Sequence, residues 1–125
     1  MLKVLIVDDH EGFLDSAERY LGTLPWVQVI GRATSGREAV ELSEKLAPQV
    51  VLMDLSMPEM DGLTATRLIK AQTAPPRVVI VSHYDDPQHR EHVARAGADG
   101  FVSKLWYVHE IVPVLRQFGG LDAHG

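Results

Sequence analysis

Carboxylate, hydroxyl and ammonium side chains stand close behind short apolar runs in this sequence. Asp8 and Asp9 follow one run, and Asp54 follows another. Ser82 and Lys104 come after two later runs. If folding gathers these positions, three carboxylates share one cleft, where each like-charge pair at about 4 Å costs on the order of 4 kcal/mol at an effective dielectric constant of about 20. The pattern therefore indicates a site that needs a bound cation.

The three acids favour a hard divalent cation. They offer oxygen ligands, with neither cysteine nor histidine among them, so Mg²⁺ or Mn²⁺ fits better than zinc. Mg²⁺ commonly keeps several waters and shares its remaining positions with phosphate oxygens. An aspartate is also a competent phosphoryl acceptor. The residue types therefore suggest phosphoryl chemistry.

Two alternating kinds of segment must position these residues. Short runs that are rich in β-branched residues and apolar on both sides predict buried strands. These runs are Leu2 to Val7, Val27 to Ala33, Val50 to Met53, Val78 to Val81 and Phe101 to Val102. Apolar residues at helical spacing predict a helix after each strand. A capping box of Ser35 and Glu38 predicts the start of the second helix. Asp86 as cap with Pro87 behind it predicts the start of the fourth.

Apolar stripes predict which face of each helix is buried. The predicted inward residues are Phe13, Ala17, Leu21 and Leu24 in the first helix, Ala39, Leu42 and Leu46 in the second, and Leu63, Leu68 and Ile69 in the third. The fifth helix is predicted to cover roughly Tyr107 to Phe118, with Pro113 near its first turn or kinking it.

Strands that alternate with helices imply a parallel sheet with helices on both faces. The fold class is therefore α/β, a flavodoxin-like, doubly wound (βα)5 sheet with strand order 2-1-3-4-5. Strand two carries no acid at its end, as this order allows for an edge strand. Ligands of such folds gather beyond the carboxyl ends of the strands. The first and third strands are neighbours about 5 Å apart, so their acids should converge.

Length and composition limit the classes of protein. The 125 residues, 46% of them hydrophobic, suffice for one domain, which we place at residues 1–118 with a flexible tail at 119–125. The net charge of −5 and the scattered basic residues argue against direct nucleic-acid binding. The apolar opening run is too short to span a membrane and, unlike a signal peptide, leads straight into two acids. The absence of cysteine is compatible with a reducing compartment, so we expect a cytoplasmic protein.

Four motifs in order resemble one known family. They are the acid pair in VLIVDDH, the loop DLSMPEMDG, the strand end VVIVSH and the late GADGFVSK. At this spacing they resemble the receiver domains of two-component response regulators. The stretch from Ser82 to Lys104 is most similar to receivers that precede a helix-turn-helix DNA-binding domain.

The resemblance implies a role for each site residue. Asp54 would be phosphorylated by a histidine kinase or a phosphotransfer protein. Asp9, Asp54 and the main-chain carbonyl of Ser56 would ligate Mg²⁺, and Asp8 would hold a metal-bound water. The resemblance further implies that the Ser82 hydroxyl would contact the phosphoryl group and that Lys104 would pair with its charge. Phe101 would take the place of the family's switch aromatic. Such a chain is a signalling domain that catalyses only its own phosphorylation and slow dephosphorylation.

Two other functions stay open on the sequence. Leu105 stands where receivers usually carry a proline, and the bulky His83 follows Ser82, so the chain could be a pseudo-receiver that binds partners without phosphorylation. A small Mg²⁺-dependent phosphatase of the haloacid dehalogenase type also uses an aspartyl nucleophile. That class has a second acid two residues later, where this chain has Ser56.

Expectations about partners come from the resemblance and from the last two helices. The chain is either a stand-alone receiver or the receiver of a longer regulator. Its fourth and fifth helices are expected to meet a partner or a second copy, through Tyr107, Val108, Ile111 and Leu115. His89 and His92 are three residues apart on a predicted helix, but no third metal ligand is evident, so we expect them to be exposed.

Overall fold

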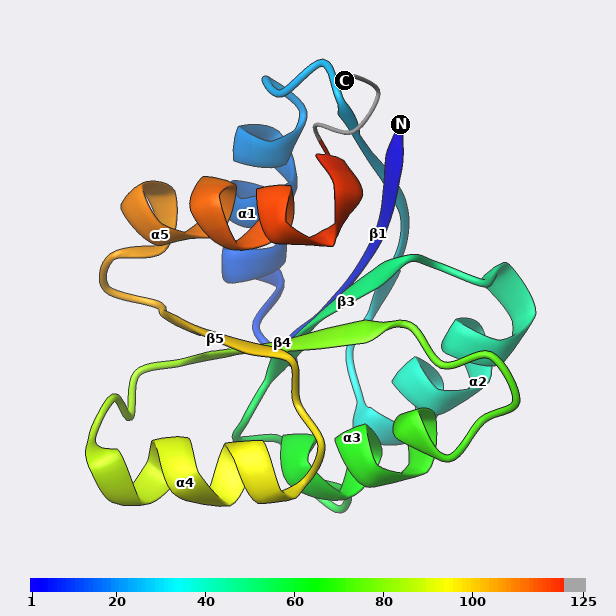
Figure 1. The fold of residues 1–125 in the computed structure, drawn as a ribbon, viewed down its shortest axis with the longest axis vertical. Helices are drawn as coiled ribbons and strands as arrows, with labels where there is room; N and C mark the ends of the chain where they lie inside the picture. The colour runs from blue at the N-terminus through cyan, green and yellow to red at the C-terminus, as the bar shows by residue number, and fades with distance from the viewer. Residues whose placement is uncertain (121–125) are drawn as a thin grey trace.

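Five parallel strands form one sheet in the order β2-β1-β3-β4-β5, which confirms the predicted fold (Figure 1). This computed structural model describes residues 1–120. The strands are β1 (Leu2–Val7), β2 (Val27–Ala33), β3 (Val50–Asp54), β4 (Arg77–Ser82) and β5 (Gly100–Ser103). The first two match their predicted bounds, because a strand buried on both faces reads as a continuous apolar run. The other three extend the prediction by one or two residues.

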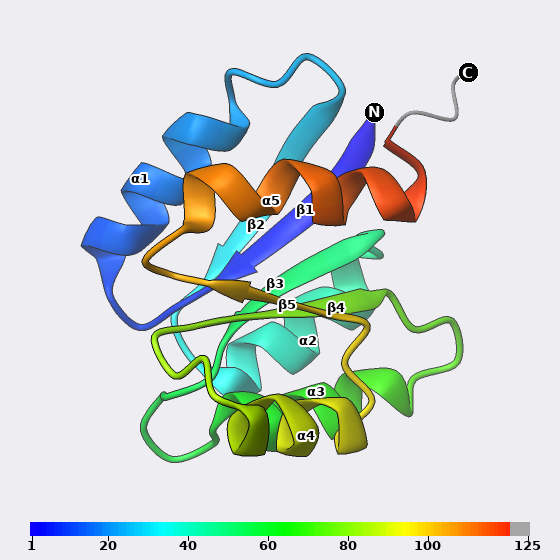
Figure 2. The same cartoon turned by 60° about the vertical axis from the view of Figure 1, so that its left-hand side comes forward.

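Helices cover both faces of the sheet (Figures 1 and 2). They are α1 (Glu11–Leu21), α2 (Gly36–Leu46), α3 (Gly62–Lys70), α4 (Pro87–Arg95) and α5 (Tyr107–Leu115). In both views α1 and α5 lie on one face, and α2, α3 and α4 lie on the other. Each layer closes its own apolar core against the sheet. The sheet is thus held from both sides, and its strand ends are rigid positions for side chains.

Side-chain caps start three of the helices. The Ser35 hydroxyl accepts a hydrogen bond from the main-chain N–H of Glu38, so the predicted cap of α2 is confirmed. The Glu38 carboxylate accepts from the N–H of Thr34, one residue before the cap. Asp86 caps α4 with Pro87 at its start, as predicted. Asp61 caps α3, the helix that follows the Asp54 loop.

Two of the predicted inward faces need correction. Leu68 was predicted to face the core, but 45% of it is exposed, while Ile69 next to it is fully buried. Successive residues of a helix point about 100° apart, and α3 turns Ala65 and Ile69 to the sheet instead. In α1 the core position belongs to Leu14, whereas Phe13 is only partly buried.

The fifth helix also differs from the prediction. Tyr107, Ile111 and Leu115, which were assigned to a partner face, are 6%, 0% and 0% exposed and belong to the core. Only Val108 of that set is exposed. The three buried residues recur at four-residue spacing, which is the spacing of one helix face, and that face packs on the sheet.

The end of α5 is short and irregular. Pro113 lies inside the helix and not in its first turn. The helix ends at Leu115, and an irregular segment, η1 (Arg116–Gly120), follows, in which the backbone of Phe118 and Gly119 is not helical. Most of the predicted tail, residues 121–125, lies outside the described residues. None of the helices up to residue 120 has the length and apolarity that a bilayer crossing requires.

Candidate functional site at the carboxyl edge of the sheet

Two buried carboxylates lie side by side where β1 and β3 end. Val7 pairs with Met53 in the sheet, so Asp8 and Asp54, one residue further on, reach the same level. Asp8 is 1% exposed and Asp54 is 5% exposed. Asp9 adds a third carboxylate, whose side chain is 27% exposed. Oxygens of all three acids lie within 4.8 Å of one another, so the structure gathers the acids that the sequence singled out.

Lys104 supplies the positive charge at this edge. Its Nζ lies 2.6 Å from Asp8 Oδ2 and 3.2 Å from Asp54 Oδ1, and its side chain is 7% exposed. Burial by itself lowers the pKa of this ammonium, but the contacts with Asp8 and Asp54 outweigh burial and raise it. The Lys104 Nζ lies over the Phe13 ring, 4.7 Å from the ring centroid. Lys104 is therefore held as a cation between two acids.

Lys104 alone does not compensate for the burial of the Asp54 carboxylate beside Asp8. Burial raises the pKa of the Asp54 carboxyl, and the neighbouring Asp8 raises it further. Lys104 acts in the opposite direction, but the net shift of the pKa is upward. The ionised form of Asp54 is thus held at a free-energy cost, which a second cation near the carboxylates would relieve.

The loop after β3 closes tightly over Asp54. The N–H of Gly62 donates to the carbonyl of Leu55 at 2.9 Å. A Cβ at position 62 would collide with the carbonyl oxygen of Asp54, so only glycine permits this approach. The loop leaves Ser56 exposed at the rim of the site.

Ser82 faces the same cleft from the end of β4. It is 2% exposed, and its Oγ accepts a hydrogen bond from the N–H of Tyr84 at 2.9 Å. The cleft has a volume of about 210 Å³ and is lined by His10, Asp54, Ser56, Ser82, His83, Tyr84 and Lys104. An acidic, a hydroxyl and an ammonium side chain therefore converge on one small space.

Phe101 lies apart from this cleft. It stands on β5, partly buried against the core, and the guanidinium carbon of Arg90 is 4.4 Å from its ring centroid. Arg90 also pairs with Asp85 in the loop after β4. Arg90 therefore connects the loop that follows Ser82 to the aromatic ring on β5.

The two departures from the receiver pattern lie at the surface. His83 is exposed and lines the cleft, whereas Leu105 is 74% exposed and does not line it. All described peptide bonds are trans, including the one before Leu105. Neither residue fills the space between Asp54, Ser82 and Lys104.

The acids fit a hard divalent ion. Asp9 Oδ1 is buried without a hydrogen-bond partner among the described residues. A buried, unpaired carboxylate oxygen beside two further carboxylates is the environment that a bound cation relieves. The carboxylates of Asp8, Asp9 and Asp54 are the groups that could hold such an ion.

Sequence reasoning missed one member of the cluster, His10. Its Nδ1 lies 3.2 Å from Asp8 Oδ1 and 3.1 Å from Asp9 Oδ1. The turn after β1 causes this approach, because the N–H of His10 donates to Asp8 Oδ1 at 2.8 Å. The available signal was the position of a metal-binding residue type directly after the acid pair.

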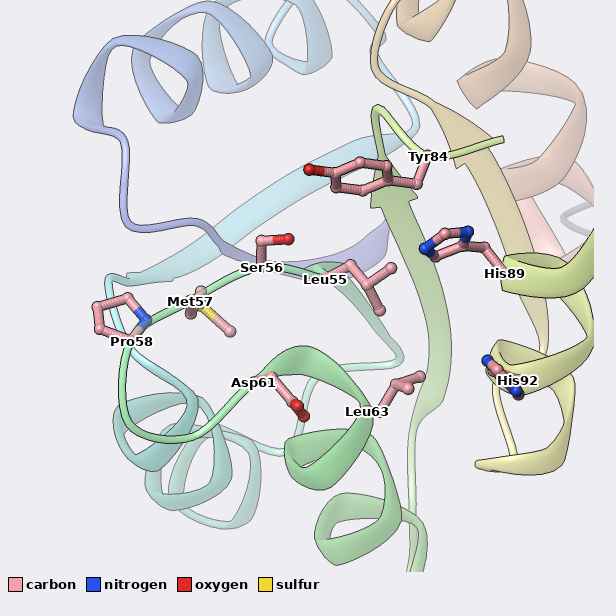
Figure 3. Close-up of a pocket in the computed structure, with 9 residues that line it drawn as sticks. All are labelled: Leu55, Ser56, Met57, Pro58, Asp61, Leu63, Tyr84, His89 and His92. Atoms are coloured by element: carbon pink, nitrogen blue, oxygen red, sulfur yellow. The ribbon is translucent and has the colours of Figure 1, made fainter. Parts of the chain in front are cut away.

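A second, larger pocket of about 640 Å³ adjoins the cleft (Figure 3). Ser56 and Tyr84 line both spaces. In Figure 3, His89 and His92 project from α4 on one side, opposite the loop that carries Ser56. His89 stacks on the Tyr84 ring and places its Nδ1 2.7 Å from Asp86. Within residues 1–120 no third ligand gathers around this histidine pair. His92 is exposed as predicted, whereas His89, which was also predicted to be exposed, is only partly exposed.

Comparison with known proteins assigns the family. A family model described as the response regulator receiver domain matches residues 4–116. The chain belongs to this family. Receiver domains are signalling domains of two-component systems, and they interact with histidine kinases and phosphotransfer proteins.

Two curated relatives of the chain are longer proteins. Response regulator GacA from Pseudomonas aeruginosa is 36% identical over 94% of this chain and 55% of its own length. Transcriptional regulatory protein LiaR from Bacillus subtilis is 35% identical over 93% of the chain and 55% of its own length. The receiver thus spans about half the length of these curated relatives. The response regulator domain of Thermotoga maritima CheB superposes with a TM-score of 0.88 at 29% identity and covers 98% of both chains.

Proposed function

We propose that this receiver accepts a phosphoryl group on Asp54 from a histidine kinase or a phosphotransfer protein. A carboxylate oxygen of Asp54 forms the new bond to phosphorus, and the bond between phosphorus and the imidazole nitrogen of the donor breaks. The nitrogen keeps the electron pair and takes up a proton. The product is an acyl phosphate on Asp54 and a free histidine on the donor.

The observation that carries the proposal is the state of Asp54. This carboxylate is buried at a rigid strand end, it shares a single lysine with Asp8, and its ionised form is disfavoured. A fixed nucleophile with few competing hydrogen bonds suits phosphoryl transfer, which depends mainly on positioning and on charge neutralisation.

The neighbouring residues take the roles that their contacts permit. The Ser82 oxygen accepts from the Tyr84 N–H, so its hydroxyl hydrogen is free to donate to a phosphoryl oxygen. Lys104 already faces Asp54 and can pair with the new negative charge. Asp9, Asp54 and the Ser56 carbonyl would hold Mg²⁺, or Mn²⁺, with Asp8 in contact through water. When bound, the ion neutralises charge on the transferring oxygens.

Phe101 and Ser82 are proposed as the switch pair. Arg90 lies between the loop after Ser82 and the Phe101 ring, so a movement of Ser82 toward a phosphoryl group changes the packing around Phe101. The exposed groups of α4 and α5, including Val108, would then meet a partner or a second copy. Light scattering with and without beryllofluoride tests the dimer, and identical monomer masses would contradict it.

The cleft supports phosphorylation over the pseudo-receiver alternative. His83 and Leu105, which suggested a degenerate site, leave the three reactive side chains in contact with one space. The proposed place of action is the cytoplasm, where phosphodonor kinases present their histidines. The output of the protein depends on what the receiver is joined to or binds.

Phosphorylation with a small donor tests the assignment. The protein is incubated with acetyl phosphate and Mg²⁺, and its intact mass is recorded. We expect one labile phosphoryl group per chain, none in Asp54→Asn, and unchanged labelling in Asp15→Asn, which removes an exposed carboxylate of α1. Equal labelling of wild type and Asp54→Asn would refute the acceptor assignment.

A further inference from the structure

His10 lies where an ion bound by the three acids would be within its reach. One nitrogen of its ring and one carboxylate oxygen from each of Asp8, Asp9 and Asp54 all lie within 4.8 Å of one another. The imidazole is exposed over most of its surface, with 73% of the side chain accessible. It can therefore turn toward an ion without breaking a packed core.

The distances match those between ligands of one ion. Two ligand atoms at about 2.1 Å from a six-coordinate ion lie about 3.0 Å apart in adjacent positions and about 4.2 Å apart in opposite ones. His10 Nδ1 lies 3.1 Å from Asp9 Oδ1, and that oxygen has no hydrogen-bond partner among residues 1–120. The two atoms thus stand at the spacing of adjacent ligands.

His10 can give up its contact with Asp8 without leaving that oxygen unpaired. Nδ1 lies 3.2 Å from Asp8 Oδ1, within hydrogen-bond distance. The main-chain N–H of His10 also donates to this oxygen at 2.8 Å. Asp8 Oδ1 therefore keeps a donor when the ring carries its hydrogen on Nε2 and Nδ1 binds a metal ion.

We propose that His10 is a direct ligand of the divalent ion, so that its imidazole raises the affinity of this site for transition ions such as Mn²⁺ and Co²⁺ and leaves that for Mg²⁺ nearly unchanged. The inference deepens the proposed function, because it rests on the same metal site. Imidazole suits first-row transition ions, whereas Mg²⁺ takes oxygen ligands and retains its waters. One nitrogen beside the acids therefore changes which ion the site selects.

Metal titration by calorimetry at one fixed pH near neutrality tests the proposal. All proteins carry His89→Gln and His92→Gln, so that the histidine pair of the larger pocket contributes nothing. In this background, His10→Gln should lower the affinity for Mn²⁺ and Co²⁺ by at least about 10- to 100-fold, which is the loss typical of residues that only orient a metal ligand. The affinity of the protein for Mg²⁺ should change little on this substitution. His109→Gln, which removes an exposed histidine of α5 outside the cluster, should match the parent.

A spectroscopic readout identifies the ligand directly. Mn²⁺ bound to the parent should give nitrogen modulation in electron spin echo spectra, and His10→Gln should abolish it. Unchanged Mn²⁺ and Co²⁺ affinities in His10→Gln, or no nitrogen signal in the parent, would overturn the role of His10 while leaving Mg²⁺ binding intact. If the parent bound none of the three ions, the proposed metal site itself would fall, and this inference with it.

Discussion

Two acids at opposite edges of the same sheet have opposite environments. Asp99 stands at the amino edge, just before β5, and accepts hydrogen bonds from Lys70 Nζ at 2.8 Å and from the Val78 N–H at 2.9 Å. Arg77 adds a longer contact at 3.4 Å. Burial alone would raise the pKa of the Asp99 carboxyl, but these donors outweigh burial and lower it. Asp99 is therefore stabilised as an anion.

Asp54, at the carboxyl edge, is left short of donors. It shares Lys104 with Asp8, and its pKa is raised where that of Asp99 is lowered. Asp54 is also more deeply buried, with 6% of its side chain exposed against 17% for Asp99, so burial, the scarcity of donors and the neighbouring acids together make the difference. One edge holds an anion to stabilise the fold, and the other keeps an excess of negative charge available for a cation and for chemistry.

The largest effect is expected from replacing Asp99, the carboxylate that several donors stabilise. Asp99→Asn leaves Lys70 without its carboxylate partner and weakens the bond to the Val78 N–H, so we expect a loss of about 3 kcal/mol in the free energy of unfolding. Urea denaturation measures it. Glu91→Gln, which breaks an exposed ion pair with Arg95 on α4, is the control and should change stability by at most about 0.5 kcal/mol. A loss no larger than the control's would remove the contrast between the edges.

The second effect is stabilisation by Mg²⁺. An ion that binds the folded chain alone raises the free energy of unfolding by about 2.7 kcal/mol at a concentration one hundred times its dissociation constant. We expect this rise in the wild type, and a smaller one in Asp9→Asn, which lacks one proposed ligand. Asp99→Asn should keep the full increment, because its edge takes no part in binding. An equal increment in wild type and Asp9→Asn would contradict the proposed ligand set.

The sequence predicts the fold and the reactive acids for a common physical reason. Buried parallel strands leave a continuous apolar run, and the residues at their carboxyl ends must meet at one edge. Asp8, Asp54 and Lys104 follow from this rule without knowledge of any side-chain contact. The environment of Asp99 does not follow from this rule, because it depends on Lys70, which reaches Asp99 from α3.

Contacts that depend on neighbouring elements are harder to predict. Leu68 was placed in the core because it is apolar, but the face of α3 that meets the sheet is set by Ala65 and Ile69. Tyr107 was placed at a partner surface although the sheet covers it. His10 joined the cluster only through the local turn after β1. In each case the residue types of the segment were interpreted correctly. The direction in which a particular side chain points was not predicted.

The smallest expected effect is a gain in the free energy of unfolding. Asp54→Asn removes the acid whose ionised form is disfavoured in the folded chain, and asparagine has nearly the same shape. We therefore expect the variant to be more stable than the wild type at neutral pH in the presence of a chelator. Urea denaturation at a series of pH values measures the difference between the two proteins, and Mg²⁺ should reduce it, because the ion relieves the same repulsion in the wild type.

The pH dependence of this gain follows from the direction of the pKa shift. Because the pKa of Asp54 is higher in the folded than in the unfolded chain, the folded wild type binds more protons than the unfolded one between the two values. The stability that Asp54 contributes to the wild type is fully present below the pKa of this carboxyl in the unfolded chain. It is lost as the pH rises through the pKa of the same carboxyl in the folded chain. The advantage of Asp54→Asn should thus be greatest at neutral pH and should vanish in acid. An advantage that grew in acid, or a variant less stable at neutral pH, would mean that Lys104 satisfies Asp54 as fully as Lys70 satisfies Asp99.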